Sequence, residues 1–195
     1  MKPIVFSEIL SNEEYEKVRN DFRKQIFGLK RGRRILVGEK ITLVFENRET
    51  LIYQIQEMVR AERMVDKDQI QNEIDAWNKV VPKENELTAS LSIQVLDNSK
   101  IEEELKPFVG LDQGVVQLEI DSNVPVTTKF HKGLSGEDWI CKEHHLSFTF
   151  DPDRIEALQD FENQAVLAIV HPNYWRKAKI PNELRQILIE DLKQD

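Results

Sequence analysis

Cysteine and long hydrophobic runs are both scarce in this chain of 195 residues. Its one cysteine, Cys141, excludes a disulfide within the chain, so nothing in the sequence requires an oxidising compartment. The longest uninterrupted apolar run, residues 165–170, is far too short to cross a bilayer as a helix. The apolar run near the N-terminus is also too short, and too soon followed by charges, for a signal peptide. We therefore expect a cytoplasmic protein that does not contact a membrane.

Positive charge is in deficit as well. The chain has 27 Lys and Arg against 35 Asp and Glu, and its net charge is −8. This balance argues against nucleic acid and anionic membranes as partners. One basic run, residues 30–34, stands out. It could contact an anion or a nucleic acid, but two structural interpretations are also open. It is either a solvated turn or a set of arginines that reach the carboxylates of the next helix.

The motifs of several common enzyme classes are missing too. The sequence has no GxxxxGK[ST], GxGxxG or GxSxG. It also has no Glu-x-x-His pair of the kind that binds a di-iron centre in helical bundles. We therefore expect no cofactor, and the sequence leaves open whether the protein is an enzyme.

One group of metal-ligating residue types does occur. Cys141, His144 and His145 lie close in sequence, and His131 lies across the expected hairpin. In a regular strand Cys141 and His144 point to opposite faces, while Cys141 and His145 are ~13 Å apart along one face. Zinc bonds of about 2.0–2.3 Å cannot join either pair. We expect no metal here, and we expect His144, on the apolar side, to be a hydrogen-bonded core histidine.

Helix caps and alternating strands follow one another without a linker. Ser11 and Glu14 form a capping box, and Asp66 with Gln69 repeats the signal. From residue 87 the hydrophobic period changes to two, which is typical of half-buried strands. These patterns predict a single α+β domain, residues 1–195. Its core is a mainly antiparallel sheet of about six strands, with a helical pair at 50–79 and the terminal helices packed on it. The strand order stays undecided, and the sheet can be closed or strongly curled.

The chain is organised around residues 41–78, where a strand, a turn and two helices follow one another. At about 100° per residue, apolar side chains of the first helix form one arc, from Leu51 to Val65, and Glu62 falls near its middle. A buried carboxylate needs a donor or a raised pKa. We predict that Glu62 is buried and bonded to an arginine, with Arg48 and Arg34 as candidates. The alternative is an acid of perturbed pKa that lines a pocket.

The polar side of this helix is the candidate functional surface. Gln56, Arg60 and Arg63 lie within about 60° of one another, and Tyr53 stands beside Arg60. Arginines with an amide and a phenol suit a carboxylate or phosphate better than a metal. The alternative is that these groups only fix the helix to its neighbours. The candidate polar cluster comprises Glu46, Arg48, Tyr53, Gln56, Glu57, Arg60, Glu62 and Arg63.

The same stretch resembles the signature of a known family. Phe45-Glu46-Asn47-Arg48, Thr50, the run 53–58 and the run 60–63 resemble the motif of domain-of-unknown-function family 3501. Its members are single-domain bacterial proteins of about this length, without an established activity. Their genes often lie beside those of rubrerythrin-like and iron–sulfur proteins. The resemblance therefore implies a redox or peroxide-stress setting, with a redox protein as the expected partner.

Two hypotheses of function follow. The first is a non-enzymatic accessory or partner-binding protein that serves a redox protein. The second is an enzyme or small-molecule binding protein that holds an anion in the candidate polar cluster. A deep cleft at this cluster would favour the second hypothesis, and a flat apolar patch elsewhere would favour the first.

Overall fold

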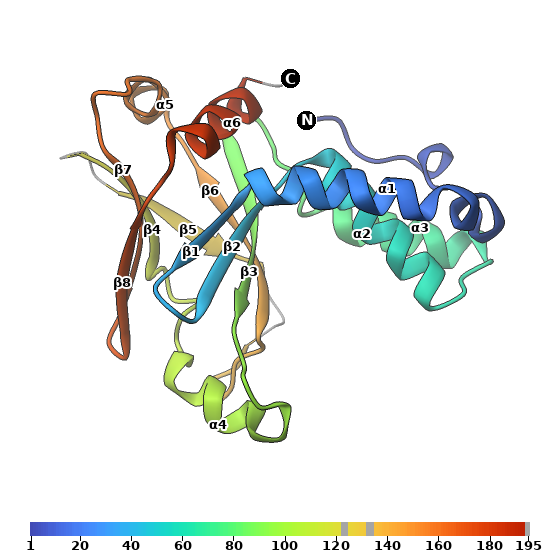
Figure 1. The fold of residues 1–195 in the computed structure, drawn as a ribbon, viewed down its shortest axis with the longest axis horizontal. Coiled ribbons are helices and arrows are strands. Elements are labelled where there is room, and N and C mark those ends of the chain that lie inside the picture. Colours follow the sequence, from blue (N-terminus) through green and yellow to red (C-terminus); the bar gives the residue numbers. More distant parts are fainter. Residues whose placement is uncertain (122–124, 132–134, 194–195) are drawn as a thin grey trace.

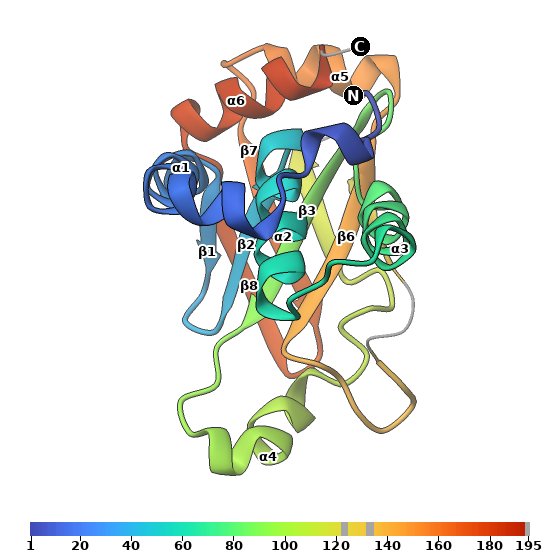
Figure 2. The ribbon, with the colours of Figure 1, turned by 90° about the vertical axis from the view of Figure 1, so that its right-hand side faces the viewer.

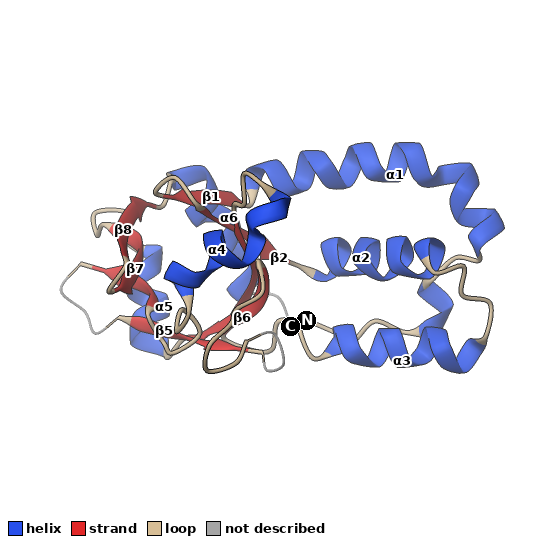
Figure 3. Cartoon of the chain, turned by 90° about the horizontal axis from the view of Figure 1, so that it is seen from below, coloured by secondary structure: helices blue, strands red, loops and turns tan. Residues whose placement is uncertain are grey.

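The sheet is antiparallel and curls almost into a barrel. The structure is a computed structural model that describes residues 1–121, 125–131 and 135–193. In this part of the chain the sheet has eight strands, in the order β1-β2-β3-β6-β5-β4-β7-β8. The strands are β1 (Arg34–Val37), β2 (Ile41–Glu46), β3 (Glu86–Ile93), β4 (Val116–Ile120), β5 (Val126–Phe130), β6 (Glu143–Thr149), β7 (Ala165–His171) and β8 (Tyr174–Lys179). Seen end-on, the strands form a nearly closed ring (Figure 3), and their buried apolar side chains make up the main core.

A tyrosine joins the first strand to the last. The Tyr174 hydroxyl on β8 donates to the Val37 carbonyl at 2.6 Å and accepts from the Lys40 amide at 3.0 Å. Gly38 has φ +67° and lies against Tyr174, so a Cβ atom at this turn would collide with the hydroxyl. The side chain of Tyr174 thus closes the seam that the strand pairing leaves open.

Helices close both ends of the barrel and form an arm at its side (Figures 1 and 2). At one end lies the short α4 (Ile101–Leu105), flanked by the 3-10 turns Asn98–Lys100 and Lys106–Phe108. At the other end lie α5 (Pro152–Gln159) and α6 (Asn182–Leu192). The helical arm comprises a 3-10 turn, Phe6–Glu8, and the helices α1 (Asn12–Gly32), α2 (Arg48–Ala61) and α3 (Lys67–Asn78). No helix in the described ranges is long and apolar enough to cross a bilayer.

The alternating strands put one set of side chains into the barrel and the other outside. In β3, Leu87, Ala89 and Leu91 are buried in the barrel core, while Thr88 and Ser90 lie on the outer face. The helical arm has a separate apolar core. It is built from Ile4, Leu51, Ile55, Val59, Met64, Ile70, Ile74, Val80 and Val81. The arm therefore packs mainly on itself and meets the barrel where α2 begins and where α1 and α3 end.

The predicted capping signals are confirmed. The Ser11 hydroxyl accepts from the Glu14 amide, and the Asp66 carboxylate accepts from the Gln69 amide. These caps are local, so three or four residues suffice to identify them.

The predicted architecture is correct in class and imprecise in detail. The sheet has eight strands among the described residues, against about six predicted. Strand β8 was not predicted. It pairs only with β7 and exposes most of its side chains, so its sequence lacks the alternation of a half-buried strand. The helical pair predicted to pack on the sheet instead belongs to the arm.

Candidate functional site

The prediction for Glu62 is wrong. Helix α2 ends at Ala61, and Glu62 is its exposed C-cap residue. The helical arc does not continue to Glu62, because the chain leaves the helix there and turns away through Arg63, with φ 52°. Val65, placed in the same arc, is 85% exposed for the same reason.

Two members of the candidate polar cluster bind the N-terminal segment. Gln56 is buried, and its amide exchanges two hydrogen bonds of 2.9 Å with the backbone of Leu10. Arg48 donates to the carbonyls of Lys2 and Pro3 and pairs with Glu8. Both side chains therefore fix the first residues of the chain to α2.

Three further members bind α1. Glu57 accepts from the Tyr15 hydroxyl at 2.7 Å and from Nε and Nη2 of Arg19. Arg60 pairs with Glu16, and the ring of Tyr53 packs among aromatic side chains of α1. These side chains do not converge on a cavity, and the exposed Arg63 and Glu62 lie at the far end of the helix.

Glu46 has a different environment, because it is buried at the junction of the arm and the barrel. Its side chain is on the outer face of β2, 2% exposed. Oε1 accepts from the Ser90 hydroxyl at 2.6 Å and lies 3.8 Å from the ammonium of Lys30. Oε2 is buried without a hydrogen-bond partner among the described residues, as is the hydroxyl of Thr88, directly opposite on β3.

A hydrogen-bond chain leads from Glu46 to a histidine. Ser90 lies opposite His145 on β6, and its Oγ is 3.2 Å from Nδ1 of the imidazole. The one hydroxyl proton of Ser90 is donated to Glu46, so Nδ1 must carry the proton that joins it to Ser90. This arrangement leaves Nε2 of a neutral His145 unprotonated, with a free lone pair.

Burial supports the neutral form of this histidine. It lowers the pKa of His145 below the ordinary value, and the nearby carboxylates of Glu46 and Glu143 oppose this shift. The edge of the ring packs against Trp77 of α3 at a centroid distance of 5.2 Å. At neutral pH His145 is therefore an acceptor held in one orientation.

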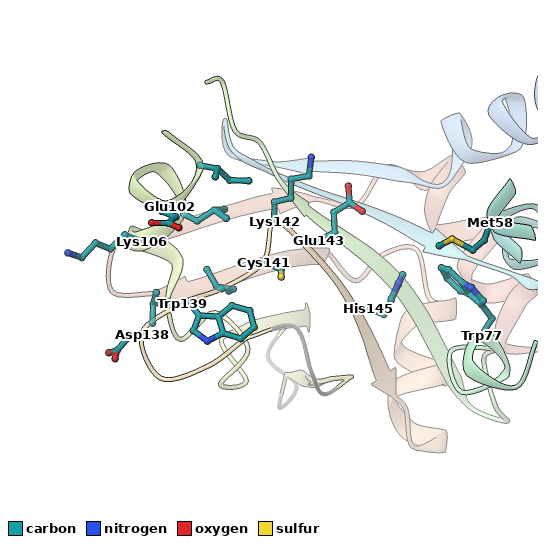
Figure 4. A pocket seen from close by; sticks show the side chains of 14 residues that line it. Met58, Trp77, Glu102, Lys106, Asp138, Trp139, Cys141, Lys142, Glu143 and His145 are labelled. Carbon is teal, nitrogen blue, oxygen red and sulfur yellow. The ribbon is translucent and has the colours of Figure 1, made fainter. Parts of the chain in front are cut away.

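His145 lines an open groove of about 900 Å³ (Figure 4). The groove runs from the helical arm, where Met58 and Trp77 contribute, along residues 139–143 to α4. Its apolar walls include Trp77, Trp139, Ile101, Leu105, Val109 and Ile140. Charged side chains of both signs are also present: Glu102, Lys106, Asp138, Lys142 and Glu143. In volume and composition the groove falls within the range of small-molecule sites.

The cysteine and histidine group has no metal geometry. His144 is 1% exposed, and its Nε2 lies 2.8 Å from the Cys141 carbonyl, so it is the core histidine that the sequence predicts. Both Cys141, which precedes β6, and His145, which lies on it, line the groove, but at different positions along its length. Within the described ranges no three His, Cys, Asp or Glu side chains are grouped to hold a metal ion.

The sequence predictions include one residue of the hydrogen-bond chain, Glu46, and miss the roles of Ser90 and His145, as well as the packing of Trp77 against His145. The alternation from residue 87 already places Ser90 on the polar face of its strand. What the sequence does not contain is the register that sets Ser90 opposite His145.

The comparisons with known proteins agree with this fold and assign no activity. The family model described as "Protein of unknown function (DUF3501)" matches residues 3–192. A crystal structure of a protein of unknown function from Burkholderia pseudomallei is similar, with a TM-score of 0.90 and 27% sequence identity. The similarity covers 98% of this chain and 100% of that one. The comparison with curated proteins gives no match.

Proposed function

This chain belongs to the DUF3501 family of proteins of unknown function, and we propose that it binds a small, largely apolar molecule in the groove beside His145. One observation carries the proposal. A partly buried hydrogen-bond chain, Glu46–Ser90–His145, orients an imidazole whose unprotonated Nε2 has no partner among the described residues, in the wall of a groove of about 900 Å³.

The groove indicates the chemistry of its ligand. Two tryptophans, Trp77 and Trp139, and several aliphatic side chains suit an aromatic or otherwise flat apolar body. The charged residues at the groove have mixed signs, so they do not select a strongly charged molecule. Because Nε2 of His145 can only accept, the ligand should carry a hydroxyl or an N–H group that donates to it.

The test compares two probes that differ in one donor, 2-naphthol and naphthalene. We expect the wild-type protein to bind 2-naphthol about fivefold more tightly, the ratio that one net hydrogen bond of ~1 kcal/mol produces. His145→Phe keeps a ring against Trp77 and leaves Ser90 bonded to Glu46, but removes Nε2. The variant should therefore bind the two probes with equal affinity. Ligand-observed NMR measures both affinities.

The matched control is Trp175→Ala, an exposed aromatic residue of β8 that does not line the groove. It should leave the preference for 2-naphthol unchanged. A wild-type protein that binds both probes equally, or a preference that survives His145→Phe, would contradict the proposal.

A second candidate function is the binding of a partner protein, for which a redox protein of the rubrerythrin-like or iron–sulfur class remains the expectation. Its support is Trp139, which is 53% exposed at the groove, since exposed aromatic side chains are enriched at protein interfaces. Co-purification from the native host should then recover such a redox protein with wild-type protein and not with Trp139→Ala.

A cytoplasmic location also stays a prediction.

A further inference from the structure

A second, smaller cavity lies on the barrel beside the end of α3. We call it the lysine pocket, with a volume of about 310 Å³, and it is lined by Lys79, Lys83, Glu86, Lys129, Phe130, His131 and Ser147. Lys79 is the C-cap residue of α3, Lys83 follows in the turn to β3, and Lys129 lies on β5. Four separate segments of the chain, with β6 as the fourth, therefore converge on this pocket.

The lysine pocket is positive in a protein of net charge −8. Its three lysines face one lining carboxylate, Glu86. Throughout the described ranges, no carboxylate lies within ion-pair distance of Lys79, Lys83 or Lys129. Three exposed lysines without an ion pair to any described residue, around one small cavity with a single lining carboxylate, give the local excess of positive charge expected of an anion site.

One hydroxyl side chain of the sheet, Ser147, lines the same pocket, and Thr88 lies beside it on the neighbouring strand. Ser147 is 6% exposed, and its hydroxyl lies 3.1 Å from Nε2 of His131. Thr88, opposite Ser147 on β3, has a buried hydroxyl without a partner among the described residues. A protonated His131 would donate from Nε2 to Ser147, which leaves the hydroxyl proton of Ser147 and Nδ1–H of His131 as donors.

Burial and neighbouring positive charge both favour the neutral form of His131. Burial lowers its pKa most, and the neighbouring His145, Lys129 and Lys83 lower it further. Glu86 is the lining carboxylate that could offset this repulsion, and Lys79 adds to the positive side. An anion bound among the lysines would reverse the local field, so His131 would take up a proton as the anion binds.

We propose that the lysine pocket binds a phosphoryl group, either free phosphate or the phosphate of a small ester. Ammonium groups bind phosphate as point charges from several directions, as three lysines on separate segments can. The compact volume favours one tetrahedral anion over an extended polyanion. This site is separate from Nε2 of His145 and does not depend on a ligand in the groove.

The experiment is calorimetric titration with inorganic phosphate and with phenyl phosphate. The double variant Lys83→Gln/Lys129→Gln should weaken binding of both by at least about tenfold, because it removes two charge-assisted contacts. The control is Lys17→Gln/Lys24→Gln, which removes the same charge from exposed positions of α1. Its affinity for both anions should stay within about twofold of the wild-type affinity. Tighter binding of phenyl phosphate would identify an ester as the ligand class, and tighter binding of phosphate would identify the free anion.

A second measurement tests the role of His131 with sulfate, which keeps its charge at these pH values. Wild-type affinity should rise as the pH falls from about 8 toward the lowered pKa of His131, because the bound anion favours the protonated imidazole, and His131→Gln should abolish this rise. Absence of saturable phosphate binding by the wild-type protein would overturn the proposal. So would equal binding by the lysine double variant and its charge-matched control.

Discussion

At the residue scale, the most deeply buried ion pair among the described residues joins the two terminal regions of the chain. Arg33, at the end of α1, makes a bidentate ion pair with Asp191 of α6, with N–O distances of 2.6 and 2.9 Å. The two residues are only 4% and 5% exposed. Arg33 belongs to the basic run 30–34, which the sequence predicts to be either a solvated turn or a set of arginines bonded to carboxylates of the next helix. For Arg33 both structural predictions are wrong, because it is buried and its partner lies on α6. Its partner lies 158 residues away, on a helix that local patterns do not connect to it.

Asp191→Asn should destabilise the fold strongly. The change leaves the Arg33 guanidinium buried beside a neutral amide, which typically costs about 3–5 kcal/mol. Urea unfolding followed by circular dichroism measures this loss. Glu39→Gln is the control, because its ion pair with Arg176 is exposed and worth less than about 1 kcal/mol. Similar small effects of both changes would show that the buried pair contributes no more than a surface pair.

At the scale of elements, α1 and α2 are joined by polar bonds as well as by apolar packing. Glu57 on α2 bonds to Tyr15 and Arg19 on α1, and the hydrogen bonds from Arg19 lower the pKa of Glu57 most, against the opposing effect of burial. Burial and the adjacent Glu57 carboxylate raise the pKa of Tyr15, so the phenol stays protonated and donates. The polar side of α2 is thereby occupied with fixing the arm together.

This contact should make the stability of the arm depend on pH. Because the pKa of Glu57 is lower in the folded than in the unfolded protein, its contribution is complete above the ordinary value of 4.5 and is lost as the pH falls below it. Glu57→Gln should therefore cost about 1 kcal/mol at neutral pH and flatten the pH profile of stability below the ordinary glutamate pKa. Thermal melts over this acidic range measure both effects, and an unchanged acid slope in the variant would refute the assignment.

The types of most helices and strands could be predicted, because they depend on residues that are neighbours in the sequence. The candidate site could not be predicted, because it depends on how distant strands align. The caps at Ser11 and Asp66 each depend on residues within one helical turn. Glu62 shows the limit of this reasoning, because one residue of error at a helix end moves a side chain from an apolar arc to solvent. The chain Glu46–Ser90–His145 crosses three strands, and the register that aligns them is a property of the whole sheet.

At the scale of the whole molecule, the two proposed sites share the place where the arm meets the barrel. His145 and Ser147 are successive outward-facing residues of β6, and one belongs to the groove while the other belongs to the lysine pocket. The His131 amide also donates to the His145 carbonyl at 2.8 Å. The barrel thus provides a rigid outer face, and the ends of the arm helices provide the second wall. Polar residues under the arm, which would be costly in a purely structural contact, are explained if this junction binds ligands.

The protonation of the His145 ring tests this account most directly. Long-range ¹H–¹⁵N NMR spectra of the imidazole should show, at neutral pH, a proton on Nδ1 and none on Nε2, as the bonds from Ser90 to Glu46 and from Nδ1 to Ser90 require. Addition of 2-naphthol should shift the Nε2 resonance as it accepts the hydroxyl proton in a hydrogen bond, and Nδ1 should keep its proton. A ring protonated on Nε2 at neutral pH, or an Nε2 resonance that does not respond to saturating 2-naphthol, would contradict the account.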